Sequence, residues 1–280
     1  MLFSSLASFA AVGLVLCGMF SFVAQFPPKY MRTFISGQSL SCILSAILSI
    51  FCQAFTSNNI NDGRLFFFIT IIWAIISICL FCYLANSKEL KTFILKDSDD
   101  TNRIASIDSQ DGESDQVNLI GYEPDGDDFS RNVLSICSDV KYELISISLI
   151  FFVTCIVFPS ITSLARSYSR NGIWKDYFTS ISFLLFNCSD AIGRLLSSAV
   201  NLNAKTLIVV STLRLIFVPL ICFCNVQPRY HSTTIFNSDL LYISFIISFS
   251  FTNGLFLSSA IVSATMPGSF KLLAFNKDLT

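Results

Sequence analysis

Long apolar stretches recur along the chain, and each is long enough to cross a membrane as a single helix. A hydrocarbon core of ~30 Å requires ~20 helical residues, and windows of about 19 residues identify such stretches. The stretches that meet this criterion are residues 2–24, 34–56, 65–86, 144–165, 177–203, 206–225 and 240–264. The pattern therefore predicts an all-α polytopic membrane protein with about seven transmembrane helices.

The apolar stretches fall into two groups on either side of a polar segment. Residues 1–86 hold the first three and residues 143–265 hold the other four. The segment 87–142 between them is acidic, rich in Asp, Ser and Gly and almost without apolar periodicity, which is typical of disorder. We therefore predict two helical domains joined by a disordered linker, with a short tail at 266–280.

Composition supports a membrane protein and excludes several other classes. Of the 280 residues, 53% are hydrophobic and 13% are charged, whereas soluble domains carry about 25% charged residues. Cys79 and Cys82 form a CxxC pair, but no second pair or nearby His completes a zinc site. The sequence contains no nucleophile beside a base, no phosphate-binding glycine loop and no basic nucleic-acid-binding face. We therefore expect no enzyme, no cofactor, no metal and no nucleic-acid partner.

Basic residues near the helix ends indicate the orientation in the membrane. Lys and Arg on the linker side outnumber those on the other side, and the basic residues of the linker supply the excess. Because positive charges collect on the cytoplasmic side, we place residues 87–142 in the cytosol and the amino terminus outside. We expect a multi-pass protein of the plasma membrane, with the lipid bilayer as a partner.

Three polar residues share one face of the stretch at 177–203. The spacing of Asn187, Asp190 and Arg194 aligns them along a helix, and the acid precedes the base at the spacing that favours an ion pair. A charge near the bilayer centre costs at least ~2.5 kcal/mol and usually faces a bundle interior or a watery cavity. The residues form either a polar patch on a substrate path, which we favour, or a self-neutralising pair that only fixes helix packing.

Arg214 lies in the next apolar stretch, at a depth similar to that of Arg194. Two arginines then share one carboxylate, so Arg214 needs a further acceptor: a backbone carbonyl near Pro219, an Asn or Ser side chain, water, or a carboxylate outside this chain. Alternatively, Arg214 extends towards the membrane interface. Pro219 frees a backbone carbonyl and predicts a kink in this helix.

Two further polar sites suggest helix contacts. Gln38, beside Gly37, lies near the predicted start of its helix and serves either in packing, which we favour, or in lining a pore. Asn253 and Gly254 combine a polar side chain with a small residue, which suits a close helix contact next to a polar contact with a substrate.

Five sequence blocks carry a family resemblance. They are FPPKYMRTFISGQSL, FPSIT, FNCSDAIGRLLSS, RLIFVPLICFCNVQPR and FSFTNGLFLSS, and the match spreads over about residues 10–262. Together with the long linker, they resemble the signature blocks of the equilibrative nucleoside transporters. The resemblance implies an eleven-helix fold related to the major facilitators, with six helices, a large cytosolic loop and five more helices. On that map, the chain corresponds to helices four to ten.

The resemblance also implies roles for the polar residues of the stretch at 177–203. Asp190 and Arg194 look like the family's acidic and basic residues, which contact the ribose and base region of a nucleoside. Asn187 lies on the same face, so we expect these three residues to bind substrate.

Structural or gating roles are implied for other positions. Arg214 and Pro219 resemble the family's ninth-helix block, Asn253 and Gly254 its tenth helix, and Gly37 and Gln38 the start of its fifth. The chain departs from the pattern in GLVLCGMFSF, which lacks the amide side chain that the family's fourth helix can supply. It also departs in the tail at 266–280, which lacks the final basic loop and helix.

We therefore predict a transporter that moves nucleosides or nucleobases by alternating access between two halves. The sequence reads as a truncated chain that is inactive without the missing helices as partners. One alternative is a seven-helix membrane receptor, which shares the helix number and orientation, although the long loop and the positions of the intramembrane charges disfavour it. The other alternative is a truncated product without transport activity.

Overall fold

The structure is a computed structural model that describes residues 2–24, 26, 28–55, 59–86, 138, 140–169, 172–200, 202–228 and 234–265. The linker predicted at 87–142 lies outside these ranges except for its last residues, and the tail at 266–280 lies outside them entirely. The chain divides into two units, one formed by Met1–Phe51 with Leu134–Thr280 and the other by Cys52–Val133.

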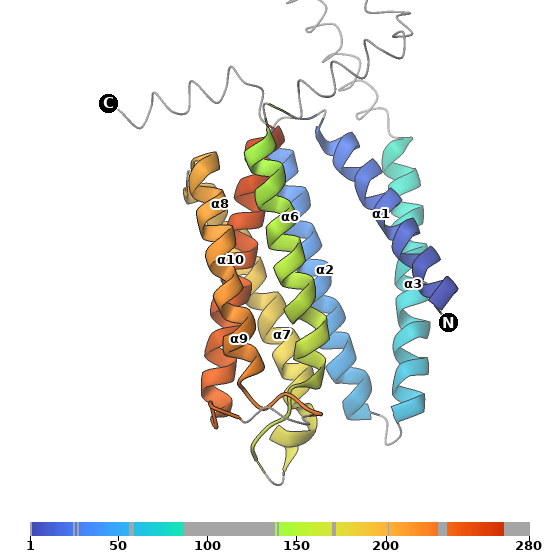
Figure 1. The fold of residues 1–280 in the computed structure, drawn as a ribbon. Coiled ribbons are helices and arrows are strands. Elements are labelled where there is room, and N and C mark those ends of the chain that lie inside the picture. Colours follow the sequence, from blue (N-terminus) through green and yellow to red (C-terminus); the bar gives the residue numbers. More distant parts are fainter. Residues whose placement is uncertain are drawn as a thin grey trace, which may run out of the picture. The chain divides into compact units, whose positions relative to one another are not determined.

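The larger unit is built around one long helix, α10. Its helices are α1 (Leu2–Ala24), α2 (Pro28–Phe55, as far as Phe51), α6 (Lys141–Cys155), α7 (Ile173–Leu196), α8 (Ala204–Leu213), α9 (Phe217–Cys222) and α10 (Asp239–Thr265). α10 packs against α6, α7, α8 and α9, most extensively against α7, and Figure 1 shows these helices running alongside one another. The described part of the second unit is the last turn of α2 and α3 (Asn59–Ala85).

The all-α fold expected from the sequence is confirmed. Each of the seven apolar stretches contains a helix, and the described residues contain no β-structure beyond an isolated antiparallel bridge between Ala165 and Val226. Within the described ranges, the helical segments long and apolar enough to cross a membrane are Lys29–Phe55, Asn61–Leu84, Lys141–Leu164, Ala204–Cys222 and Asp239–Ala264. α1 contributes a shorter apolar stretch, Ala11–Val23.

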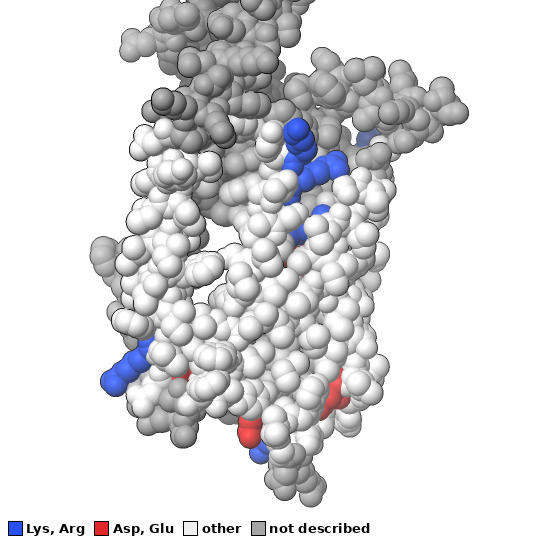
Figure 2. Space-filling model, turned by 180° about the vertical axis from the view of Figure 1, so that it is seen from behind, with Lys and Arg blue, Asp and Glu red and all other residues white. Residues whose placement is uncertain are grey.

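Charged residues are few on the surface in view (Figure 2), and α7 contains more of them than the helices that qualify as membrane spans. Figure 2 shows only a few charged side chains on the face in view, and most of that face is uncharged. α7 is not among the candidate membrane spans, because charged residues lie at its start and again in its second half. A helix with such a polar face is suited to the interior of a bundle.

Several helices begin earlier than predicted. α2 begins at Pro28 instead of residue 34, α3 at Asn59 instead of 65, and α7 at Ile173 instead of 177. A hydropathy window detects the apolar part of a helix, whereas the backbone continues as helix through flanking polar residues. Proline is also well suited to the first position of a helix, because its missing N–H has no partner there.

The helix that contains α6 does not continue smoothly to residue 165. After Cys155 the chain forms a π-helical segment, Ile156–Ile161, in which Phe158 has an extended backbone with φ −120° and ψ 126°. The residue before a proline is disfavoured in the α region, and Pro159 follows Phe158 directly. The Phe158 ring therefore leaves the helix line and stacks on Phe186 of α7, with ring centroids 3.9 Å apart.

The helix at 204–222 is interrupted in a similar way. A single 3₁₀ turn, Arg214–Ile216, separates α8 from α9. Pro219 cannot donate a hydrogen bond to Leu215, four residues earlier, and its ring crowds that carbonyl. The kink predicted from Pro219 is therefore present, but the 3₁₀ turn Arg214–Ile216 lies about one helical turn before the proline.

Aromatic side chains fill the core of the larger unit. Phe178, Phe186 and Phe249 are buried with Tyr242 against aliphatic residues of α6, α9 and α10. A smaller apolar cluster joins Met31 and Ile35 of α2 to Val262 of α10, with residues of α1 packed on it. Through the first cluster α10 packs against α6, α7 and α9, and through the second it packs against α1 and α2.

Asp239, the first residue of α10, connects this helix to the first turn of α7 and to the segment that precedes it. Its Oδ2 accepts hydrogen bonds from Ser167 Oγ at 2.6 Å and from Trp174 Nε1 at 2.9 Å, and its Oδ1 accepts one from the Tyr168 backbone N–H at 3.0 Å. A carboxylate at a helix amino terminus also interacts favourably with the helix dipole. Asp239 therefore fixes the end of the α7–α10 pair.

Replacement of Asp239 by Ala should lower the melting temperature of the purified chain in detergent. The change removes three hydrogen bonds to a charged acceptor and should cost about 1–3 kcal/mol in unfolding free energy. Ser244→Ala is the matched control on the same helix, because within the described residues the Ser244 hydroxyl bonds only to the Leu240 carbonyl of α10 itself. Equal melting temperatures for the two variants would show that the Asp239 contacts contribute nothing.

Candidate functional site

α7 and α10 approach each other closely at two glycines. A Cβ atom on Gly193 would collide with the backbone of Phe251 and lie 2.8 Å from the nitrogen of Leu255. A Cβ on Gly254 would collide with the carbonyl of Asp190 and lie 2.9 Å from the nitrogen of Arg194. Small residues allow helix backbones to approach in this way. The close helix contact expected at Gly254 is therefore present, with Gly193 as its partner.

This close approach brings Asp190 within reach of α10. The Asp190 carboxylate accepts a hydrogen bond from Arg194 Nε at 2.7 Å through Oδ2 and another from Asn253 Nδ2 at 2.6 Å through Oδ1. Asp190 and Asn253 are only 6% and 4% exposed. The ion pair predicted between Asp190 and Arg194 is therefore formed, and Asn253 adds a second donor from the neighbouring helix.

The same amide of Asn253 also contacts Arg214. Its Oδ1 accepts from Arg214 Nη2 at 3.1 Å and from Thr154 Oγ1 of α6 at 2.6 Å. Arg214 Nη2 also lies 3.3 Å from Thr154 Oγ1 and 3.4 Å from the Phe249 carbonyl, and the guanidinium lies over the Phe249 ring, 4.6 Å from its centroid. We call Thr154, Asp190, Arg194, Arg214 and Asn253 the core polar cluster.

Burial decides between the alternatives for Arg214. The residue is only 1% exposed, so it does not extend to the membrane interface. Its acceptors are an Asn side chain, a Thr hydroxyl and the Phe249 carbonyl, and not a carbonyl near Pro219. Arg214 Nε and Nη1 are buried without a hydrogen-bond partner among the described residues.

The core polar cluster holds one carboxylate and two guanidinium groups. Arg194 is bonded to Asp190 through Nε alone among the interactions of the described residues. Its terminal nitrogens therefore remain available as donors, and each carboxylate oxygen of Asp190 has a further lone pair. The cluster is thus equipped to bind a neutral molecule that carries both hydroxyl and carbonyl groups.

Asn187 lies on the same helix but outside the cluster. Its Nδ2 donates to the Cys42 carbonyl of α2 at 3.4 Å, so α2 and α7 meet one turn from Asp190. Gln38 is half-buried on α2, and a Cβ on Gly37 would meet nothing within 4 Å. The prediction that these two residues lie near a helix start is wrong, because the helix begins at Pro28 and not at residue 34.

Two polar residues that contact α10 were missed from the sequence, the half-buried Thr154 and the buried Glu143. Thr154 belongs to the apolar segment SLIFFVTC, and a single hydroxyl in such a segment does not indicate which residues of other helices it will contact. Glu143 lies in the first turn of α6, where an acid is common at a helix end, yet it is only 3% exposed and its Oε1 accepts from Ser263 Oγ of α10 at 3.2 Å. No group of three or more potential metal ligands occurs among the described residues.

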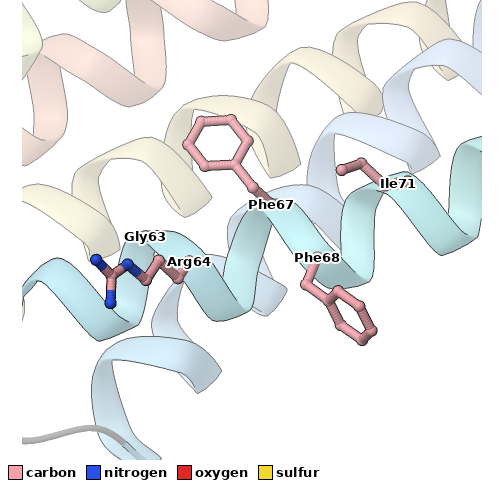
Figure 3. A pocket seen from close by; sticks show the side chains of 5 residues that line it. All are labelled: Gly63, Arg64, Phe67, Phe68 and Ile71. Carbon is pink, nitrogen blue, oxygen red and sulfur yellow. The ribbon is translucent and has the colours of Figure 1, made fainter.

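A hollow on α3 is not a candidate for the site. Its lining residues are Gly63, Arg64, Phe67, Phe68 and Ile71, and Figure 3 shows that they all come from this one helix, with the two phenyl rings pointing in opposite directions. Arg64 is the only charged side chain among them. Because one helix cannot enclose a ligand, we place the candidate site at the core polar cluster.

The fold and this site define a class: a multi-pass helical membrane protein with a charged, hydrogen-bonded cluster buried between its helices. Within that class, the family model for nucleoside transporters matches residues 3–271. The chain belongs to this nucleoside transporter family.

Curated relatives agree with the family. Equilibrative nucleoside transporter 1 of Homo sapiens is 25% identical over 266 residues, which cover 86% of this chain and 56% of the relative. Equilibrative nucleoside transporter 2 is 28% identical over 268 residues in Homo sapiens and 29% identical over 268 residues in Rattus norvegicus, and each match covers 86% of this chain and 58% of the relative. The chain thus spans a little over half the length of these relatives. The family match favours a transporter over a seven-helix receptor.

The glycine contact provides a test of the site's architecture. Gly254→Ala should destabilise the chain by about 1–3 kcal/mol or more, because the added methyl group meets backbone atoms of α7 that cannot turn aside. Gly37→Ala is the control, since its methyl group enters open space and alanine favours the helix by roughly 0.5–1 kcal/mol. Melting temperatures in detergent measure both, and a Gly254→Ala chain as stable as the Gly37→Ala chain would contradict the close approach.

Proposed function

We propose that this chain forms part of a transporter that carries nucleosides or nucleobases across a membrane by alternating access. The observation that carries the proposal is the ion pair of the buried Asp190 with the partly exposed Arg194, which keeps hydrogen-bonding capacity on both residues. The relatives are named as equilibrative nucleoside transporters, which gives the substrate class.

The chemistry of the pair suits a nucleoside. An ionised carboxylate accepts hydrogen bonds from adjacent hydroxyl groups, such as those of a ribose, and a guanidinium donates to carbonyl oxygens in a fixed geometry. Asn187 lies one turn from Asp190 on the side of α2, where its amide can contact a base edge. We assign Asp190 and Arg194 to the ribose and base region and Asn187 to the base.

Alternating access requires two halves that move about a shared binding site. We propose that residues 1–86 belong to one half and residues 143–265 to the other, with the linker 87–142 in the cytosol and the protein in the plasma membrane. The interruptions at Phe158 and at Arg214–Ile216 support this proposal, since broken helices next to a binding site are common in transporters. The further helices of the longer relatives would complete the pathway.

Nucleoside binding should raise the melting temperature of the purified chain in detergent. A ligand that binds only the folded state stabilises it in proportion to its concentration. Uridine or adenosine should give a saturable shift, whereas the matching 2′,3′-dideoxynucleoside should give a smaller one because it lacks the hydroxyl donors for Asp190. Equal shifts for the nucleoside and its dideoxy analogue would contradict the assignment of Asp190 to the ribose.

Asp190→Asn is the matching variant for this measurement. It keeps the side-chain volume and removes the charge, so the nucleoside-dependent shift should fall to that of the dideoxy analogue. Its melting temperature without ligand is the control for folding, since Arg194 then loses its partner and removal of one member of a buried pair can cost about 3–5 kcal/mol. A variant that melts earlier but still binds nucleoside like the wild type would assign the pair a packing role only.

Binding should not by itself give transport. Liposomes that contain only the 280-residue chain should show no saturable nucleoside uptake, because a moving pathway needs both halves around the cavity. Co-expression with the helices that the relatives have beyond the matched region should restore uptake in cells. Saturable uptake by the chain alone, blocked by excess unlabelled nucleoside, would overturn this part of the proposal.

A further inference from the structure

We propose that Asn253 is a positioning residue for the substrate site: it acts on the nucleoside through Asp190 and does not touch it. The inference rests on the proposed function and adds the group that sets the orientation of the Asp190 carboxylate. Its basis is the set of contacts that one amide makes with three other elements, namely Asp190 of α7, Arg214 of the 3₁₀ turn after α8, and Thr154 of α6.

The two charged neighbours fix which way the amide faces. Arg214 has only donors, and the ionised Asp190 carboxylate has only acceptors. With Oδ1 towards Arg214 and Nδ2 towards Asp190, both contacts are hydrogen bonds, at 3.1 Å and 2.6 Å. A flipped amide would place donor against donor and acceptor against acceptor at the same distances. Asn253 therefore presents a donor to Asp190 at all times while Arg214 stays in place.

This donor holds the carboxylate in one orientation. Asn253 Nδ2 contacts Oδ1 and Arg194 Nε contacts Oδ2, so rotation of the carboxylate would break one or both bonds. The remaining lone pairs of Asp190 and the terminal nitrogens of Arg194 are then held in fixed directions. A site that recognises hydroxyl groups depends on such fixed acceptors, because a small misplacement costs much of the binding geometry.

The burial of the contact supports a positioning role. Asn253 is 4% exposed and both ends of its amide are bonded to protein, whereas the side chain of Arg194 is 14% exposed and its terminal nitrogens have no partner among the described residues. On the proposed function, Arg194 and Asp190 therefore bind the nucleoside and Asn253 orients Asp190. Arg214 belongs with Asn253, because it contacts Asp190 only through Asn253.

The test uses Asn253→Asp in the purified chain, with nucleoside affinity measured by thermal shift between about pH 8 and pH 5. At high pH, two carboxylates face each other at positions 190 and 253 and Asp190 loses its donor. When one of them is protonated at low pH, an O–H group again lies between them. We expect affinity to be about tenfold weaker than wild type at pH 8 and to recover as pH falls.

The charged groups around position 253 are few within the described residues. Asp190 and Arg214 contact it, Arg194 lies behind Asp190, and Thr154 of α6 is uncharged. Glu143 of α6 contacts Ser263, ten residues further along α10 and therefore ~15 Å away. A pH effect on affinity that is specific to the variant therefore reports on position 253 and its two neighbours. Wild type measured at the same pH values corrects for all other groups.

Two further variants separate positioning from packing. Asn253→Leu keeps a similar volume without any donor, so its affinity should stay weak at every pH. Thr252→Val is the matched control on the same turn of α10, because the Thr252 hydroxyl bonds only to the carbonyls of its own helix. It should bind nucleoside like the wild type.

A second pair of variants covers the case in which the changes at Asn253 prevent folding. Thr154→Val removes one of the two donors that bond to Asn253 Oδ1 and should weaken affinity by about threefold, whereas Thr154→Ser should restore it. Variants that melt earlier but bind nucleoside with wild-type affinity at all pH values would overturn the positioning role and leave the proposed function intact. A wild-type chain that gives no nucleoside-dependent shift would instead overturn the proposed function, and the positioning role with it.

Discussion

The close approach of α7 and α10 is the constraint on which the rest of the site depends. It exists because Gly193 of α7 meets the backbone of Phe251 and Leu255, and Gly254 of α10 meets the backbone of Asp190 and Arg194, without a side chain between them. At any wider separation, the amide of Asn253 would not reach the Asp190 carboxylate. The two glycines therefore link helix packing to the geometry of the site. The contact that they allow between α7 and α10 also brings Asn253, the second hydrogen-bond donor, to Asp190, the acid of the core polar cluster.

Charge imbalance shapes the cluster as strongly as packing does. Two guanidinium groups share one carboxylate, and a buried charge that lacks partners is far more costly than a buried neutral group. Arg194 takes the carboxylate directly, so Arg214 is left with neutral acceptors and the face of the Phe249 ring. A ring face attracts a cation by about 0.5–2 kcal/mol. The neutral amide of Asn253 then connects the second arginine to the carboxylate without a further acid.

Around this fixed pair of helices, two others are interrupted at positions that face the core. The chain leaves the α-helix at Phe158, before Pro159, and at Arg214–Ile216, before Pro219. Pro219 could be recognised from the sequence as a break, but the altered turn lies at its i−4 partner and so coincides with Arg214. The arginine that anchors Asn253 thus belongs to a 3₁₀ turn, which places a charged side chain at the interruption between α8 and α9.

The sequence by itself determined the elements and the chemical inventory. Apolar runs long enough for a bilayer marked seven stretches, each of which contains a helix, and helical spacing alone placed Asp190 and Arg194 in one ion pair. Only the tertiary structure decided which acceptors Arg214 uses, that Gly193 is the partner of Gly254, and that Thr154 and Asn253 join the cluster. The reason is physical: contacts within a helix follow from the 3.6-residue repeat, whereas contacts between helices depend on rotation and separation, which no local pattern records.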